Sequence, residues 1–315
     1  MNSINDIKAI IELEQTWTAK AKQLLNFYSA MGMYEHCYIS IKIIEKICDL
    51  QRKLINNTTD LMLNYSTLRY CLEALIQSKL LVKEKSFVYK LYFSIYIHQI
   101  KKAQNFIDRL DREIRLIAEY EKLENEIEIP VSIESTWCES EIKEKMDEFH
   151  EKVQCLYDRA SEELTLFFGD VENNGFTFQK HIMENELRDT YSKRIVHLLN
   201  LKRAKEREIL SDARIKSLFN FNGQPSKVFS ELEDKRSWSA KAKETNLEKE
   251  YELIYELSSA ILHSFSYSLI TPNETEEDEQ ELTLKMICKY SKETLQVLNN
   301  FIDYASFSKF NVVTL

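Results

Sequence analysis

The sequence predicts an all-α protein, and its composition and periodicity carry that prediction. Only 4 glycines and 3 prolines occur among 315 residues, so the chain lacks the turn residues that a many-stranded sheet needs. Apolar residues recur with a helical period along most of the length. Hydrophobic residues make up 44% of the chain, enough for a substantial core. We therefore expect a multi-helix bundle with long antiparallel helices and no substantial sheet.

The first 126 residues form the N-terminal half of the predicted bundle. Helices are expected at about 4–31, 33–55, 60–84 and 86–126. Gly32 and the polar stretch NNTTD mark the first two joints. The fourth helix runs for about 40 residues without Gly or Pro, a length of roughly 60 Å. The pattern stops at 127–138, where Pro130 and β-branched residues occur, so we expect a linker or hinge there.

Residues 139–315 form the C-terminal half, which we expect to pack on the first. Helices are expected at about 139–168, 179–220, 247–268 and 281–306. The segment GDVENNG, from Gly169 to Gly175, separates the first two and reads as a turn. No repeat of fixed period runs through these segments.

The net charge, the cysteines and the absence of long apolar runs indicate the environment in which the protein works. The formal net charge is −9, which disfavours nucleic-acid binding by the whole surface but permits a local basic patch. The 6 cysteines are scattered without a C-x-x-C pair, which favours free thiols in a reducing cytoplasm. No run of about 18 apolar residues occurs and the N-terminal stretch is interrupted by charges, so we expect neither a membrane span nor a signal peptide.

Cofactor and metal sites are not expected. Dispersed glycines cannot build a G-x-G-x-x-G turn or a P-loop, and no G-x-S-x-G elbow or kinase signature is present. His181 and Glu184 are spaced as a possible ligand pair, but no His or Cys partner follows a known metal spacing. We predict no cofactor and no metal.

One basic segment stands out within the acidic chain. Residues 188–216 carry nine Lys or Arg against four Asp or Glu. The cluster KRAKER contributes Lys202, Arg203, Lys205 and Arg207. A solvated helix face is the more ordinary explanation of the segment, and RNA phosphates would bind here if the protein binds RNA.

Two polar groupings lie at the borders of apolar helix stripes. In LRYCLEALIQSKLLV, Arg69 and Glu73 are i,i+4 neighbours. If the Glu73 carboxylate is buried, Arg69 is therefore the nearest cation that could pair with it. In YELIYELSSAILHSF, His263 follows Ser259 by four residues and Glu256 by seven. His263 is thus a candidate general acid or base, or else a histidine held by a carboxylate of another helix.

The two groupings, with RSWSAKAKETN between them, resemble the bacterial family known as domain of unknown function 5677. That family pairs an R-x-x-x-E helix with a Trp-containing segment and a Y-x-x-x-Y-x-x-L-S-x-x-x-H helix. The matching residues are Arg69, Glu73, Trp238, Tyr251, Tyr255, Ser258 and His263. The resemblance spans about residues 35–270 and implies an all-helical bacterial protein, distantly like abortive-infection and HEPN-type proteins, several of which are RNases.

Two functions remain open at this point. The first is a non-catalytic interaction or regulatory protein of a bacterial defence or stress system, with a polar cluster of Arg69, Glu73 and His263 between helices. It would bind a protein partner or a second copy of itself. The alternative is a metal-independent, HEPN-like RNase in which Arg69 holds phosphate, His263 moves a proton and Glu73 orients it. The R-x(4–6)-H spacing of HEPN nucleases is missing from the helix of His263.

Overall fold

The computed structural model describes residues 2–30, 33–127, 138–219, 232–263 and 276–310. For Ala30, Ala260, Leu262, His263 and 303–310 it describes the backbone only. Throughout these residues the regular elements are helices, and no strand occurs among them. The all-α prediction is therefore confirmed. No helix in this part of the chain is both long enough and apolar enough to cross a membrane.

The chain divides into two compact units that do not follow the predicted boundary at 127–138. Unit 1 contains residues 1–94 and 209–315, and unit 2 contains residues 95–208. The chain leaves unit 1 within helix α5 (Phe87–Glu126) and returns to it within α9 (Arg188–Ser211). Because uninterrupted helices cross both boundaries, no Pro- or Gly-rich linker marks either crossing in the sequence.

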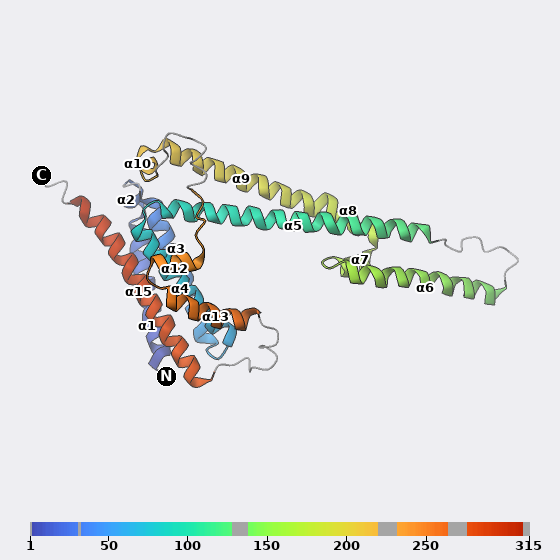
Figure 1. The fold of residues 1–315 in the computed structure, drawn as a ribbon, viewed down its shortest axis with the longest axis horizontal. Coiled ribbons are helices and arrows are strands. Elements are labelled where there is room, and N and C mark those ends of the chain that lie inside the picture. Colours follow the sequence, from blue (N-terminus) through green and yellow to red (C-terminus); the bar gives the residue numbers. More distant parts are fainter. Residues whose placement is uncertain (1, 31–32, 128–137, 220–231, 264–275, 311–315) are drawn as a thin grey trace. The chain divides into compact units, whose positions relative to one another are not determined.

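Unit 1 is a helical bundle built on one central helix, α4 (Leu61–Lys83). Helix α4 contacts α3 (Tyr34–Asn56) and the long helix α15 (Glu277–Phe310) (Figure 1). The first helix, α1 (Asn2–Gln23), packs on α3 and α15, and the short α2 (Leu25–Ala30) follows it. Many of the fully buried side chains of this core come from α3 and α4.

Local sequence explains where α4 begins. Asp60 precedes it, and its carboxylate accepts a hydrogen bond from the backbone N–H of Leu63 at 2.8 Å. Such an N-cap satisfies one of the amides that a helix start leaves without an intrahelical partner. One face of α4 is buried, for instance at Leu72 and Leu75, while Arg69 and Glu73 lie at its border.

Two further helices of unit 1 pack on α4, namely α12 (Trp238–Glu244) and α13 (Glu248–His263). Ser237 caps α12 by accepting a hydrogen bond from the N–H of Ala240. Asn246 then adopts a left-handed conformation with φ 58, and Leu247 N–H donates to the Ala242 carbonyl at 2.8 Å. This closes α12 and turns the chain into α13, because Asn tolerates positive φ better than most residues.

Unit 2 contains most of α5 and α9 and, between them, α6 (Glu139–Glu163), α7 (Phe168–Asn174) and α8 (Phe176–Ile182). Its core includes Leu110, Ile117 and Phe176. A short π-helix, η1 (Met183–Leu187), joins α8 to α9.

The predicted turn at 169–175 is wrong for most of its length, since Phe168–Asn174 is helical. Gly169 sits inside that helix, and only Gly175, with φ 80, breaks it. The predicted linker at 127–138 lies almost wholly outside the described residues.

Candidate functional site

Arg69 and Glu73 form the ion pair that their spacing predicts. Arg69 Nε donates to Glu73 Oε1 at 2.9 Å, and the two side chains are 25% and 20% exposed. Both belong to α4, so an i,i+4 pair on one helix edge brings them together without help from another element. The pair is half-buried, which makes its attraction less screened than that of a fully exposed pair.

Tyr255 of α13 covers this ion pair from a second helix. The guanidinium carbon of Arg69 lies 4.9 Å from the centroid of the Tyr255 ring, within the range of a cation–π contact. Tyr255 is 43% exposed, so the contact lies at the surface of unit 1. Residues that are 186 positions apart in sequence thereby share one site.

An aromatic ladder extends the site along α13 and α12. The Tyr255 and Tyr251 rings stack with centroids 5.6 Å apart, and Tyr251 stacks on Trp238 at 6.3 Å. Burial raises the pKa of Tyr251, and the nearby Glu73 carboxylate raises it further. The phenol therefore stays neutral near pH 7. The predicted residues Arg69, Glu73, Trp238, Tyr251 and Tyr255 thus lie in one continuous cluster.

The two remaining residues of the resembling motif contribute differently. Ser258 is fully buried, and its hydroxyl donates to the backbone carbonyl of Tyr255, one turn earlier, at 3.3 Å. It therefore satisfies itself within its own helix instead of facing a substrate. His263 is the last residue of α13, and its side chain is not among those described.

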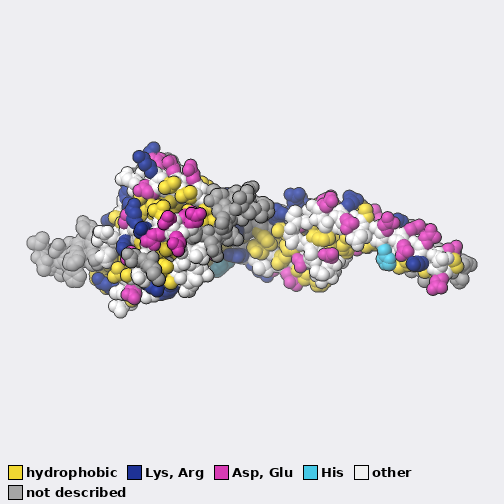
Figure 2. Space-filling model, turned by 90° about the horizontal axis from the view of Figure 1, so that it is seen from below, with side chains coloured by type: hydrophobic (Ala, Val, Ile, Leu, Met, Phe, Trp, Pro, Cys, Tyr) yellow, Lys and Arg dark blue, Asp and Glu magenta, His cyan; other side chains and the backbone are white. Residues whose placement is uncertain are grey.

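Neighbouring acids neutralise part of the predicted basic segment. Arg188 pairs with Asp111 at 3.0 Å, Lys202 with Glu206 at 3.0 Å, and Lys205 with Glu208 at 2.8 Å. Among the described residues, Arg203 and Arg207 form no ion pair and are exposed. On the face seen in Figure 2, Lys and Arg side chains are interspersed among Asp, Glu and hydrophobic side chains.

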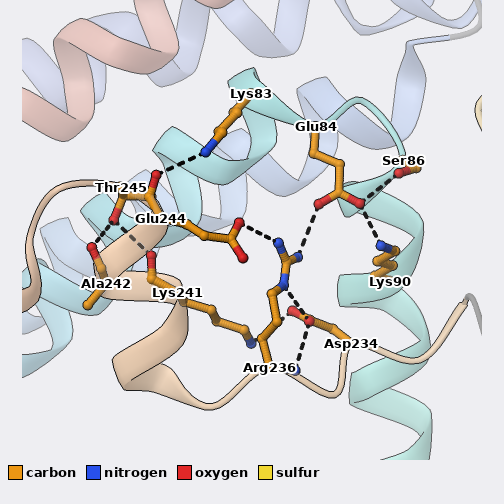
Figure 3. Close-up of polar contacts among 10 residues, drawn as sticks. All are labelled: Lys83, Glu84, Ser86, Lys90, Asp234, Arg236, Lys241, Ala242, Glu244 and Thr245. Atoms are coloured by element: carbon orange, nitrogen blue, oxygen red, sulfur yellow. Dashed lines mark hydrogen bonds and ion pairs between the residues drawn. The ribbon is translucent and has the colours of Figure 1, made fainter.

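Sequence reasoning missed a second polar cluster in unit 1, which we call the Arg236 clasp. Arg236 Nε contacts Asp234 at 2.8 Å, and its two terminal nitrogens contact Glu244 at 2.9 Å and Glu84 at 3.1 Å (Figure 3). Its guanidinium carbon also lies 5.3 Å from the Phe87 ring centroid. One side chain thus ties the segment before α12 to the corner between α4 and α5.

Lysines complete the clasp. Lys241 contacts Asp234 at 3.0 Å, and Lys90 contacts Glu84 at 2.6 Å. Burial alone would raise the pKa of Asp234, but Arg236 and Lys241 outweigh it and hold that pKa below its ordinary value. The clasp contains three cations and three carboxylates, and they pair mainly with one another. We therefore interpret it as a structural joint.

A third missed feature is a buried carboxyl group in the core of unit 1. Glu14 of α1 has no exposed surface, and neither carboxyl oxygen meets a hydrogen-bond donor among the described residues. Burial raises its pKa from 4.5 to about 8, and nearby Gln51 and Arg52 oppose that rise only in part. Glu14 is therefore mainly protonated at neutral pH.

These arrangements define what the site can do. A paired guanidinium under a tyrosine ring can fix two helices in register or contact a partner's carboxylate or aromatic group. Within the described residues, no three His, Cys, Asp or Glu side chains are grouped to hold a metal ion. The six cysteines are free thiols.

No family model, curated protein or solved structure matches the chain.

Proposed function

We propose that the protein is a non-catalytic helical interaction protein in which the Arg69, Glu73 and Tyr255 cluster holds α4 and α13 in register. On the sequence resemblance to the family known as domain of unknown function 5677, we further propose that it acts in a bacterial defence or stress system. Its partner would be another protein or a second copy of the chain.

The observation that supports this proposal most is the engagement of Arg69 on two sides. Its Nε is bonded to the Glu73 carboxylate at 2.9 Å, and one face of its guanidinium lies against the Tyr255 ring. A carboxylate bonded to an arginine offsets part of the positive charge that would attract a phosphate. At Arg69, a bound phosphate would compete with a carboxylate that is already in place.

The same geometry suits a structural role. A half-buried ion pair covered by an aromatic ring is satisfied only when the two helices adopt one relative register. The Ser258 hydroxyl, which bonds its own helix, adds no group that would activate a nucleophile. The polar residues of the cluster thus specify packing, as expected of a scaffold that presents a defined surface.

Removing Arg69 tests the proposal against the RNase alternative. Arg69→Ala should lower the free energy of unfolding by about 1–2 kcal/mol, because it leaves Glu73 unpaired. Lys193→Ala is the matched control, since Lys193 forms an i,i+4 ion pair with Asp189 in which both side chains are at least half exposed. This control should change stability by less than about 0.5 kcal/mol.

The same preparations are then incubated with labelled single-stranded RNA in the presence of a metal chelator. We expect no cleavage by the wild-type chain. Metal-independent cleavage that disappears in Arg69→Ala and His263→Ala, at unchanged melting temperature, would contradict the proposal and establish the RNase alternative.

A further inference from the structure

Helix α6 carries a heptad pattern from Ile142 to Ala160. Its apolar positions are spaced by alternating steps of four and three residues, and we call them the α6 seam: Ile142, Met146, Phe149, Val153, Leu156 and Ala160. This spacing places them at the a and d positions of a coiled coil, where each side chain inserts between residues of a facing helix. The pattern therefore indicates a helix built to pair with other helices.

Only one end of the seam is covered by unit 2. Leu156 and Ala160 are buried in its core. Ile142, Phe149 and Val153 are half-buried, Met146 is 36% exposed, and among the described residues none of the four belongs to that core or packs against it. We call these four the outer seam. It continues, in the same heptad register, an interface that α6 already makes within unit 2.

The charges on α6 are sorted by position. The e and g positions, which border a coiled-coil seam, hold Lys143, Lys145, His150, Lys152, Tyr157 and Arg159. Seven acids occupy the outward b, c and f positions, namely Glu141, Glu144, Asp147, Glu148, Glu151, Asp158 and Glu162, and the other two, Glu139 and Glu163, stand at the a and d positions just beyond the two ends of the seam. The apolar stripe is therefore bordered by cations although the helix as a whole is acidic.

Two of these cations are available to a partner. Among the described residues, Lys143 and Lys152 form no ion pair. Lys145 contacts Glu148 at 3.4 Å, and both side chains are about half exposed. Like charges at facing e and g positions oppose pairing, in the parallel as in the antiparallel arrangement. A second copy of α6 would set lysines against lysines, so the border charges select against it.

We propose that the outer seam of α6 binds an amphipathic helix of a partner protein, one whose apolar a and d stripe is bordered by Glu or Asp. Such a helix would extend the seam from Val153 to Ile142 and place carboxylates beside Lys143, Lys145 and Lys152. The outer seam spans 12 residues, or about 18 Å, which matches somewhat under two heptads. This inference rests on the proposed role as an interaction protein and names the chemistry of its partner.

Two designed peptides test the inference on the full chain. Both have three heptads with leucine at a and d; one carries Glu at every e and g position and the other carries Lys. Binding is followed by fluorescence anisotropy of the labelled peptide. We expect saturable binding of the Glu peptide and at least about tenfold weaker binding of the Lys peptide.

Variants of α6 locate the binding. Phe149→Gln should weaken the Glu peptide about tenfold, because a polar amide then enters the apolar stripe. The double variant Lys145→Glu, Lys152→Glu should reverse the preference in favour of the Lys peptide. The control Lys101→Glu, Lys102→Glu makes the same change in net charge at exposed positions of α5 and should leave the preference unchanged. Circular dichroism confirms that each variant is folded.

Several results would overturn the inference. These are the absence of Glu-peptide binding at about 100 μM, equal binding of both peptides, or insensitivity to the α6 charge reversal. A wild-type dimer that Phe149→Gln converts to a monomer would also overturn it, since the occupant would then be a second copy. The two failures are distinguishable, because absent Glu-peptide binding leaves the Arg69 stability result untouched, whereas RNA cleavage is measured in an assay without the peptide and contradicts the proposed function itself.

Discussion

The guanidinium of Arg69 lies 4.9 Å from the ring centroid of Tyr255, although the two residues belong to different helices and are far apart in sequence. This contact joins α4 to α13 at the surface of unit 1. Its strength can be measured, because both side chains can be removed singly and together.

A double-mutant cycle should find coupling between Arg69 and Tyr255. We expect Arg69→Ala and Tyr255→Leu to show an interaction energy of about 0.5–1 kcal/mol in urea unfolding, in the range of a partly exposed cation–π contact. The pair Arg69 and Tyr191 provides the control, since Tyr191 belongs to unit 2 and stacks on Phe106. Strict additivity of Arg69→Ala and Tyr255→Leu would show that the contact contributes nothing.

The buried Glu14 should give unit 1 a pH-dependent stability. Its pKa is raised to about 8 in the folded chain, against 4.5 as its ordinary value. The folded state therefore holds a proton that the unfolded state releases between these values. The resulting stabilisation is complete below about pH 4.5 and is lost as the pH rises through about 8, on the order of 1 kcal/mol per pH unit.

Glu14→Gln, which mimics the protonated acid, should flatten this part of the pH dependence and stabilise the protein at pH 8–9. Chemical unfolding at a series of pH values measures the effect. Glu12→Gln changes an exposed carboxylate of the same helix and should leave the slope unaltered. A Glu14→Gln curve parallel to that of the wild type would contradict the assignment of the proton to Glu14.

Loss of the Arg236 clasp should destabilise unit 1 strongly. Arg236→Ala removes the shared cation of three carboxylates, one of which, on Asp234, is 4% exposed. We expect a loss of about 2–3 kcal/mol, because charged groups are left buried without their partner. Arg214 also bonds its neighbouring aspartate, Asp212, but is 66% exposed, so Arg214→Ala should change stability little. Similar losses in the two variants would argue against a joint at Arg236.

Any RNA binding by α9 should depend on Arg203 and Arg207 more than on Lys202 and Lys205. The two arginines form no ion pair among the described residues, whereas the two lysines are paired with Glu206 and Glu208. Replacing both arginines by Gln should reduce the slope of log affinity against log salt by about 1.4, the value for two single-strand phosphate contacts. Equal effects of the arginine and lysine pairs would contradict this ranking.

Replacing His263 separates a structural from a chemical role. In a non-catalytic protein, His263→Ala should affect stability or leave the chain unchanged, and RNA should stay intact in both cases. Proton transfer by His263 would instead show as a loss of cleavage of about 10²- to 10⁴-fold without a change in melting temperature. Both quantities must be measured on one preparation.

Local patterns predicted the helices and the Arg69–Glu73 pair, because both depend on residues within a few positions of each other. The contact of Tyr255 with Arg69 and the Arg236 clasp depend on tertiary packing, which spacing along the chain does not encode. The predicted helix boundaries agree better with the structure than the predicted division into two halves does, because both crossings between the units lie inside helices.

Two further features can be recognised from the sequence pattern alone. Glu14 lies on the same helical stripe as Ile7, Ile10, Trp17 and Ala21, all of which are buried, so its burial could have been read from periodicity. The α6 heptads are equally recognisable, although acids outnumber bases on that helix. Assigning each charge to its heptad position, rather than counting charges, distinguishes a seam that binds a partner helix from a solvated helix face.

The way in which unit 2 interrupts unit 1 has a consequence for synthesis on the ribosome. Residues 95–208 are all made before α15, which packs on α1, α3 and α4. The Ser3 hydroxyl donates to the Glu281 carboxylate at 2.7 Å, so α1 is bonded to a helix that is made much later than itself. Unit 2 can therefore condense before α15 is made, and the apolar surface of α1, α3 and α4 that α15 covers stays accessible to chaperones until α15 emerges.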